Sequence, residues 1–199
     1  DVYAVGAIDW NAREFHGYTT EQGITYNAYL ILDEKITLID TVKYTMTDEL
    51  IERIQSIVDP AKIDVVVCNH IEMDHSSSLP AILKVAPNAA VYASAPQGVK
   101  ELKAFYGEDL EVNGVKTGDT LGIGKRTLHF VQTPMVHWPD NMVTYSDVDK
   151  ILFSNDAFGQ HYASSTRFDD ESDYCEVMKQ ARSTTPTLCC RTAVRQTRR

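Results

Sequence analysis

The sequence predicts a layered α/β fold from three observations. Short apolar strands alternate with amphipathic helices in the first half of the chain, and mainly strands follow in the second half. This order is typical of domains in which helices pack against sheets. The third observation is size, because 199 residues with 43% hydrophobic content suffice for one or two domains with a sizeable core.

Strands are expected where short apolar segments rich in β-branched residues stand between turn residues. Ile63–Cys68 is the clearest case, because a continuous run of this kind is typical of a strand that is buried on both faces. Ile24–Leu32 and Ile36–Asp40 flank an Asp-Glu-Lys turn, which predicts a hairpin. The other expected strands are Val2–Trp10, Ala90–Ala93, Thr127–Thr133, Met142–Ser146 and Ile151–Phe153.

Helices are expected at residues 47–58, 79–85 and 96–106. The first carries an apolar stripe at helical spacing, formed by Leu50, Ile51, Ile54 and Ile57. Thr47 is its expected N-cap, and Asp59-Pro60 is its expected end.

Composition and charge exclude several classes of protein. The net charge of −9 disfavours nucleic-acid binding, because an acidic surface repels phosphate. The chain contains no apolar run near the roughly 18 residues that span a membrane, and no signal segment opens it, so a membrane protein is not expected. Cys68 and Cys175 show neither zinc-site spacing nor a disulfide framework, which indicates a reducing, cytoplasmic compartment.

The densest chemical signal follows the strand predicted at Ile63–Cys68. His70, Glu72, Asp74 and His75 bring four potential metal ligands within six residues. In extended backbone, residues 70, 72 and 74 point the same way and can converge. Imidazoles and carboxylates form a hard ligand set that suits iron, manganese or zinc rather than copper(I). The alternative is an exposed polar loop without a metal.

Two further candidates follow later strands. His137 comes after the strand expected at residues 127–133, and Asp156 comes after the strand expected at residues 151–153. A carboxylate such as Asp156 can bridge two cations and reduce the repulsion between them. His129 and His161 are expected to be structural.

Together these residues resemble the metallo-β-lactamase-fold domain of flavodiiron proteins, also called A-type flavoproteins or rubredoxin:oxygen oxidoreductases. The resemblance covers residues 1 to 181. It rests on His70-x-Glu72-x-Asp74-His75, His137-Trp138-Pro139-Asp140 and Ser154-Asn155-Asp156, and on the segments at residues 6–11, 15–18 and 25–30. It implies a metallo-β-lactamase-like αββα sandwich, here incomplete. Hydrolytic members of the superfamily usually carry His at the position of Glu72, and a carboxylate there favours iron and redox chemistry over zinc hydrolysis.

The resemblance also implies roles for single residues. His70, Glu72 and His137 would hold one iron, and Asp74 and His75 would hold the second, with Asp156 as the bridge. Trp138 would lie towards the flavin as a catalytic and cofactor-binding residue, and His16 would lie towards the substrate pocket as a catalytic residue.

The implied activity is the reduction of O2 to water or of NO to N2O, and the sequence leaves open which of the two is preferred. In this family electrons come from FMN in a C-terminal flavodoxin-like domain, which rubredoxin or a similar carrier reduces. A head-to-tail homodimer brings the flavin of one subunit to the irons of the other. Alternatives left open are a zinc-dependent hydrolase on the same fold and an inactive truncated remnant.

The resemblance ends at residue 181, before the last His ligand of the second iron and before the flavodoxin-like domain. Residues 182–199 contain five Arg and no acidic residue. One choice of codons for residues 183–193, read two bases later, encodes Tyr-Tyr-Ala-Asn-Ile-Val-Leu-Pro-Tyr-Gly, which resembles the next helix of the family. We therefore expect a partial diiron domain over residues 1–181 and a frameshifted, disordered basic tail over residues 182–199. A solvated basic tail is the alternative. The chain opens at Asp1 inside an expected strand, so we also expect it to be truncated at its N-terminus.

Overall fold

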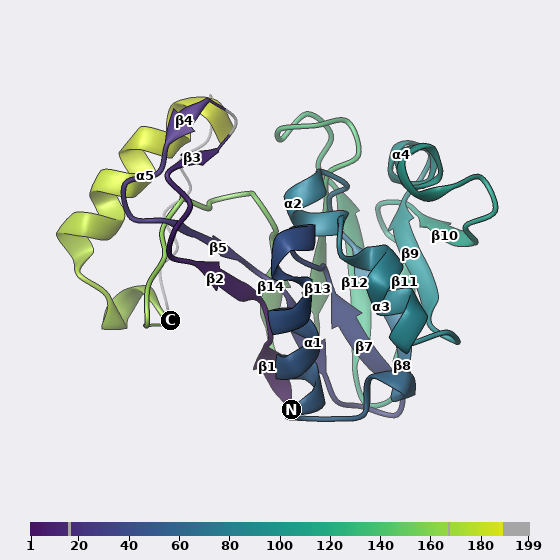
Figure 1. Cartoon of the computed structure of the whole chain (residues 1–199). Helices are drawn as coiled ribbons and strands as arrows, with labels where there is room; N and C mark the ends of the chain where they lie inside the picture. The colour runs from purple at the N-terminus through teal and green to yellow at the C-terminus, as the bar shows by residue number, and fades with distance from the viewer. Residues whose placement is uncertain (16, 167, 189–199) are drawn as a thin grey trace. The chain divides into compact units, whose positions relative to one another are not determined.

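The computed structural model describes residues 1–15, 17–166 and 168–188. The chain forms two compact units, one of Asp1–Ala7 and Tyr26–Asn155 and the other of Ile8–Thr25 and Asp156–Arg199. The first unit contains the layered fold that the sequence predicts (Figure 1).

A six-stranded sheet organises the first unit. Its order is β1-β6-β7-β8-β9-β10. Strands β7 to β10 run parallel to one another, whereas β6 runs antiparallel to both of its neighbours, β1 and β7. Because parallel strands end at the same edge of a sheet, the residues that follow β8 lie at that edge. The strands are β1 (Val2–Ala4), β6 (Tyr29–Ile31), β7 (Ile36–Ile39), β8 (Ile63–Cys68), β9 (Ala90–Ser94) and β10 (Val112–Val115).

A second, antiparallel sheet packs on the first. It comprises β11 (Thr120–Gly122), β12 (Thr127–Gln132), β13 (Met142–Ser146) and β14 (Ile151–Phe153), in that order. Apolar side chains from both sheets form one buried cluster, which includes Val65 and Val67 of β8 and Leu128 and Phe130 of β12. The hydrophobic core of the first unit therefore lies between the two sheets.

Helices lie against the six-stranded sheet (Figure 1). They are η1 (Tyr44–Met46), α1 (Thr47–Gln55), η2 (Pro60–Lys62), α2 (Met73–Ser76), α3 (Leu79–Val85) and α4 (Gln97–Tyr106). Val66 and Cys68 alternate with Val65 and Val67 along β8, and all four are buried, which confirms the predicted strand with two buried faces. No α-helix within the described ranges has both the length and the apolar character needed to cross a bilayer.

The second unit is smaller. It contains the hairpin of β3 (Glu14–Phe15) and β4 (Tyr18–Thr19), together with η3 (Asp169–Glu171) and α5 (Tyr174–Leu188). The strands β2 (Ala7–Asp9) and β5 (Ile24–Tyr26) pair with each other. Ala7 and Tyr26 belong to the first unit, and the other residues of both strands belong to the second.

Helix α5 differs from the expectation of a disordered tail. It continues through residues 182–188, while residues 189–199 lie outside the described residues. Its start is capped by Asp173, whose Oδ1 accepts the N–H groups of Cys175 and Glu176 at 2.8 and 3.1 Å.

Two predicted strands are each divided in the structure. Val2–Trp10 was expected as one strand, but β1 and β2 belong to different sheets. The chain turns at Gly6, where Val5 and Gly6 both donate to the carbonyl of Ala28. A Cβ at Gly6 would lie 2.0 Å from the carbonyl oxygen of Tyr26, so only glycine fits there. Residues 24–32 are divided at the same point into β5 and β6.

Helix α1 begins at Thr47, as expected, but its N-cap and its end differ from the expectation. Its N-cap is Met46, because the preceding turn η1 places Thr47 inside the helix, where its hydroxyl donates to the carbonyl of Tyr44 at 2.7 Å. The helix ends at Gln55, before Asp59-Pro60. Asp59 instead caps η2 by accepting the N–H of Ala61 at 3.0 Å.

Candidate metal centre

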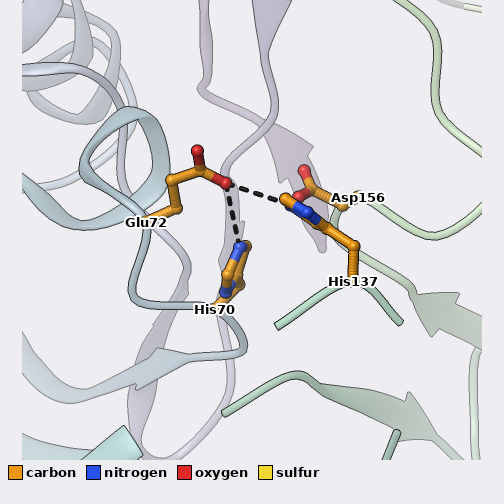
Figure 2. Close-up of side chains that lie close together, drawn as sticks. All are labelled: His70, Glu72, His137 and Asp156. Carbon is orange, nitrogen blue, oxygen red and sulfur yellow. Dashed lines mark hydrogen bonds and ion pairs between the residues drawn. The ribbon is translucent and has the colours of Figure 1, made fainter. Parts of the chain in front are cut away.

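Three predicted ligands of the first unit converge on one point. The Nε2 atoms of His70 and His137 lie 3.2 and 3.1 Å from the same carboxylate oxygen, Oε2 of Glu72. Figure 2 shows these two contacts as dashed lines. His70 and Glu72 follow β8 of one sheet, and His137 lies in the connection between β12 and β13 of the other. Ligands that are 65 residues apart in sequence thus meet where the two sheets end.

The backbone after β8 corrects one part of the prediction. Extended backbone was expected through Asp74, but Met73–Ser76 forms the short helix α2 with Glu72 as its N-cap. The N–H of His75 donates to the carbonyl of Glu72 at 2.9 Å and closes the first turn. His70 and Glu72 therefore converge as predicted, whereas Asp74 and His75 project from helical backbone.

Asp140 fixes the orientation of the His70 ring. Its Oδ2 lies 2.8 Å from Nδ1 of His70 and accepts the N–H of Ile71 at 2.7 Å. A carboxylate at Nδ1 favours the tautomer that carries its proton there. A metal would displace the proton from Nε2, whose lone pair would then be directed to the side of Glu72 and His137.

A buried polar network supports the same edge of the sheets. Asp40 accepts the backbone and side-chain N–H groups of Asn69 at 2.6 and 2.9 Å, and the Thr144 hydroxyl donates to the Asn69 side chain at 2.7 Å. Burial raises the pKa of Asp40 against the effect of these Asn69 hydrogen bonds. The hydroxyl of Thr41 also donates to the carbonyl of His75 at 2.7 Å. These bonds join the ends of β7 and β8 to β13 next to the candidate ligands, because Asn69 directly precedes His70.

Glu72 is held in its ionised form. Burial by itself would raise the pKa of this carboxyl, but hydrogen bonds and positive charge from His137 and His70 lower it to about 2. The carboxylate is therefore negative at neutral pH and available to a cation.

A second pair of predicted ligands lies on α2. Nε2 of His75 is 2.9 Å from Oδ2 of Asp74, and the ring centroids of His70 and His75 are 5.6 Å apart. Asp74 and His75 are 8% and 9% exposed. Oδ1 of Asp74 is buried and has no hydrogen-bond donor among the described residues. A buried carboxylate oxygen of this kind fits a cation, because burial without a partner costs free energy.

The remaining predicted residues are less closely defined. The Trp138 ring is half-buried with its centroid 5.4 Å from that of His70, next to the candidate ligands. Asp156, which Figure 2 also labels, is the first residue of the second unit and directly follows Asn155 of the first. His16 lies outside the described residues.

Two residues near the site were assigned no role from the sequence. Asp140 appears in the motif that follows His137, but its contact with His70 depends on packing that spacing does not reveal. Glu101, on α4, lies close enough to hydrogen-bond with Asp140, and nothing in its local sequence signals this.

Comparison with known proteins agrees with this class of fold and site. A family model described as "ODP family beta lactamase" matches residues 24–197. The domain is therefore metallo-β-lactamase-like, as predicted.

The similar proteins define the family more closely. The nitric oxide reductase of Moorella thermoacetica is 47% identical over 90% of this chain and 46% of its own length. The rubredoxin-oxygen oxidoreductase of Megalodesulfovibrio gigas is 48% identical over 85% of this chain and 42% of its own. The crystal structure of the flavodiiron protein from Giardia intestinalis superposes with a TM-score of 0.90 at 45% identity, over 94% of this chain and 46% of that one. The chain belongs to the flavodiiron proteins and spans somewhat less than half the length of these relatives.

Proposed function

We propose that the chain supplies the diiron site of an oxygen or nitric oxide reductase, an oxidoreductase that converts O2 to water or NO to N2O. The observation that carries the proposal is the convergence of two imidazole Nε2 atoms on one Glu72 oxygen. The names of the relatives support both substrates, since one is a nitric oxide reductase and another a rubredoxin-oxygen oxidoreductase. A hard nitrogen and oxygen ligand set is also suited to iron.

The proposed ligand sets follow from these contacts. His70, Glu72 and His137 would hold one iron, and Asp74 and His75 would hold the other. On the family resemblance, Asp156 would supply a carboxylate that the two irons share. When bound, the irons supply electrons to O2 or NO.

The protein contributes orientation and charge. Glu72 remains ionised and offsets part of the positive charge of the metals. Asp140 keeps the Nε2 atom of His70 turned inward. On the family resemblance we assign Trp138 to the side of the site that the flavin approaches, and its ring packs beside His70 and His137. His16 is assigned to the substrate pocket on the family resemblance alone.

The further components of the reaction are also proposals. FMN in a flavodoxin-like domain would pass electrons to the irons, and rubredoxin or a similar carrier would reduce the FMN. The name of the M. gigas relative supports a rubredoxin-type donor. We further propose a head-to-tail homodimer in the cytoplasm, on the family resemblance and the cysteine pattern.

The division of the chain is proposed on its sequence. Residues 1–181 would form the diiron domain, and residues 182–199 would be read out of frame. The coding DNA tests this division directly. A coding sequence with no continuation of the family in another frame would contradict it.

Metal analysis tests the proposed function. The chain is purified without oxygen, with iron and zinc both present, and the metal content per chain is measured for wild type and Glu72→Gln. Wild type should retain close to two irons, and Glu72→Gln should lose iron because an amide does not replace the charge of the carboxylate. Glu111→Gln is the matched control, since Glu111 is exposed before β10. A single zinc in wild type, or unchanged iron in Glu72→Gln, would overturn the proposal.

A further inference from the structure

Asp140 has one carboxylate oxygen that the His70 contact does not use. The side chain is almost fully buried, at 1% exposed, and Oδ2 serves both His70 and the N–H of Ile71. The other oxygen, Oδ1, is buried and meets no hydrogen-bond donor among the described residues. A buried carboxylate oxygen without a donor costs free energy, so a neighbouring group that supplies a donor would stabilise it.

The group that faces Asp140 is the carboxyl of Glu101 on helix α4. Oε2 of Glu101 is also buried and also meets no donor among the described residues, although the two side chains lie within hydrogen-bonding reach of each other. Helix α4 is anchored here through β9. Ser94 donates to the backbone carbonyl of Asp140 and accepts the N–H of Gly98 at 3.3 Å.

Two ionised carboxylates in this position would repel each other. A single shared proton removes the repulsion and supplies the missing donor, as in other close carboxyl pairs. Burial and the negative charge of Asp140 raise the pKa of Glu101 to about 7, while the charge of His70 acts in the opposite direction. Asp140 from the β12–β13 connection and His70 from the end of β8 are the ionisable groups that act on this carboxyl from other elements.

We propose that Glu101 is a positioning residue, whose protonated carboxyl donates to Oδ1 of Asp140 and thereby holds Asp140 on Nδ1 of His70. The inference extends the proposed function, because it rests on His70 as a metal ligand. The effect of Glu101 on His70 would pass through Asp140, with which the Glu101 carboxyl can hydrogen-bond.

Two variants separate the effect of the hydrogen-bond donor at residue 101 from the effect of the volume of its side chain. Glu101→Gln keeps the shape and provides a permanent amide donor, whereas Glu101→Leu keeps bulk and removes the donor. Co2+ affinity, measured by optical titration without oxygen, should fall about threefold to tenfold in Glu101→Leu, somewhat less than a direct hydrogen-bond partner of a ligand causes. Glu101→Gln should stay within about twofold of wild type, because it restores the donor. The exposed residue Glu111 provides the control Glu111→Leu.

A metal-free measurement tests the proton itself. The infrared difference between wild type and Glu101→Gln should show the carbonyl stretch of a protonated carboxyl at pH about 5.5. The band should vanish by pH about 8.5, above the raised pKa of Glu101.

The outcomes distinguish this inference from the proposed function. Absence of the band across that pH range overturns the shared proton, whatever the metal data show. Equal Co2+ affinity in wild type and Glu101→Leu overturns the positioning role. If wild type binds no Co2+, the proposed function fails, and the infrared band alone supports or overturns the Glu101–Asp140 pair.

Discussion

Some residues of this site can be recognised from the sequence, whereas others acquire their role only through contacts in the folded chain. The convergence of Glu72 with His70 could be predicted, because a carboxylate between two His residues in one motif suits a shared set of ligands. Asp140 could not, because its role depends on contact with His70, which is 70 residues away in sequence. Spacing within a motif predicts which residues can converge, but the partner that orients each ring comes from another element of the fold.

A prediction at the residue scale concerns Asp140. Asp140→Ala should weaken Co2+ binding about tenfold to a hundredfold, because the ring of His70 loses the carboxylate that sets its tautomer and orientation. The free energy of unfolding of the metal-free chain should also fall by about 1–3 kcal/mol, because the buried N–H of Ile71 loses its acceptor. Optical titration and urea unfolding measure the two effects separately.

Asp109→Ala is the control for this variant, since Asp109 is exposed on the loop between α4 and β10. It should change neither quantity. A metal affinity that is unchanged in Asp140→Ala would show that the contact with His70 does not orient the ring.

At the scale of elements, the sequence predicts strands and helices best where one pattern holds throughout. Residues 79–85, 142–146 and 151–153 form the expected elements with the expected boundaries. The failures occur where tertiary contacts override the local pattern. The apolar run of residues 2–10 continues through Gly6, but close approach to the backbone of Tyr26 forces a turn there. Helix α2 was missed because four residues are too few for helical periodicity to appear.

A prediction at this scale concerns the turn before β12. Arg126 is buried there, and its guanidinium lies 3.1 Å from Asp33 and 2.7 Å from Asp149. It links the β6–β7 turn with the turn after β13. Arg126→Met should lower the free energy of unfolding by about 2–4 kcal/mol at pH about 7, because two carboxylates lose their partner. Urea unfolding measures the change, and the adjacent, exposed Lys125 gives the control Lys125→Met.

The same link predicts a pH dependence. A hydrogen bond from Arg126 lowers the pKa of Asp149, and backbone and Arg126 hydrogen bonds lower that of Asp33 despite its burial. A carboxyl whose pKa is lower in the folded chain contributes stability above its unfolded pKa of about 3.9, and this stability is lost as the pH falls through the folded pKa. The difference between wild type and Arg126→Met should therefore be largest near neutral pH and shrink below pH about 3. A difference that stays constant with pH would contradict this account.

The whole first unit is organised so that its two sheets meet at the candidate site. His70, Glu72, Asp74 and His75 follow β8 of the six-stranded sheet, whereas His137 and Asp140 lie between β12 and β13 of the other. The sequence indicated polar residues after several strands. It could not indicate which strands become neighbours, because that order depends on how the sheets pack. A metal bound here would therefore connect the two sheets.

This arrangement predicts that metal binding stabilises the whole fold. Ligands from both sheets come together only in the folded chain, so binding shifts the folding equilibrium by mass action. With free Fe2+ at about 100 times its dissociation constant, the gain should be about 2.7 kcal/mol. For a domain of this size that corresponds to a rise in the melting temperature of about 5–10 °C. Anaerobic calorimetry with and without Fe2+ measures the rise, and a chelator should reverse it.

The variant Glu72→Gln separates this effect from nonspecific stabilisation by a divalent cation on an acidic protein. Its rise in melting temperature with Fe2+ should be much smaller than that of wild type, because Glu72 provides the oxygen on which both imidazoles converge. The exposed control Glu111→Gln should keep the full rise, since it removes the same charge far from the candidate ligands in sequence. Equal rises in all three proteins would mean that the cation binds the general negative charge of the chain rather than the site between the sheets of the first unit.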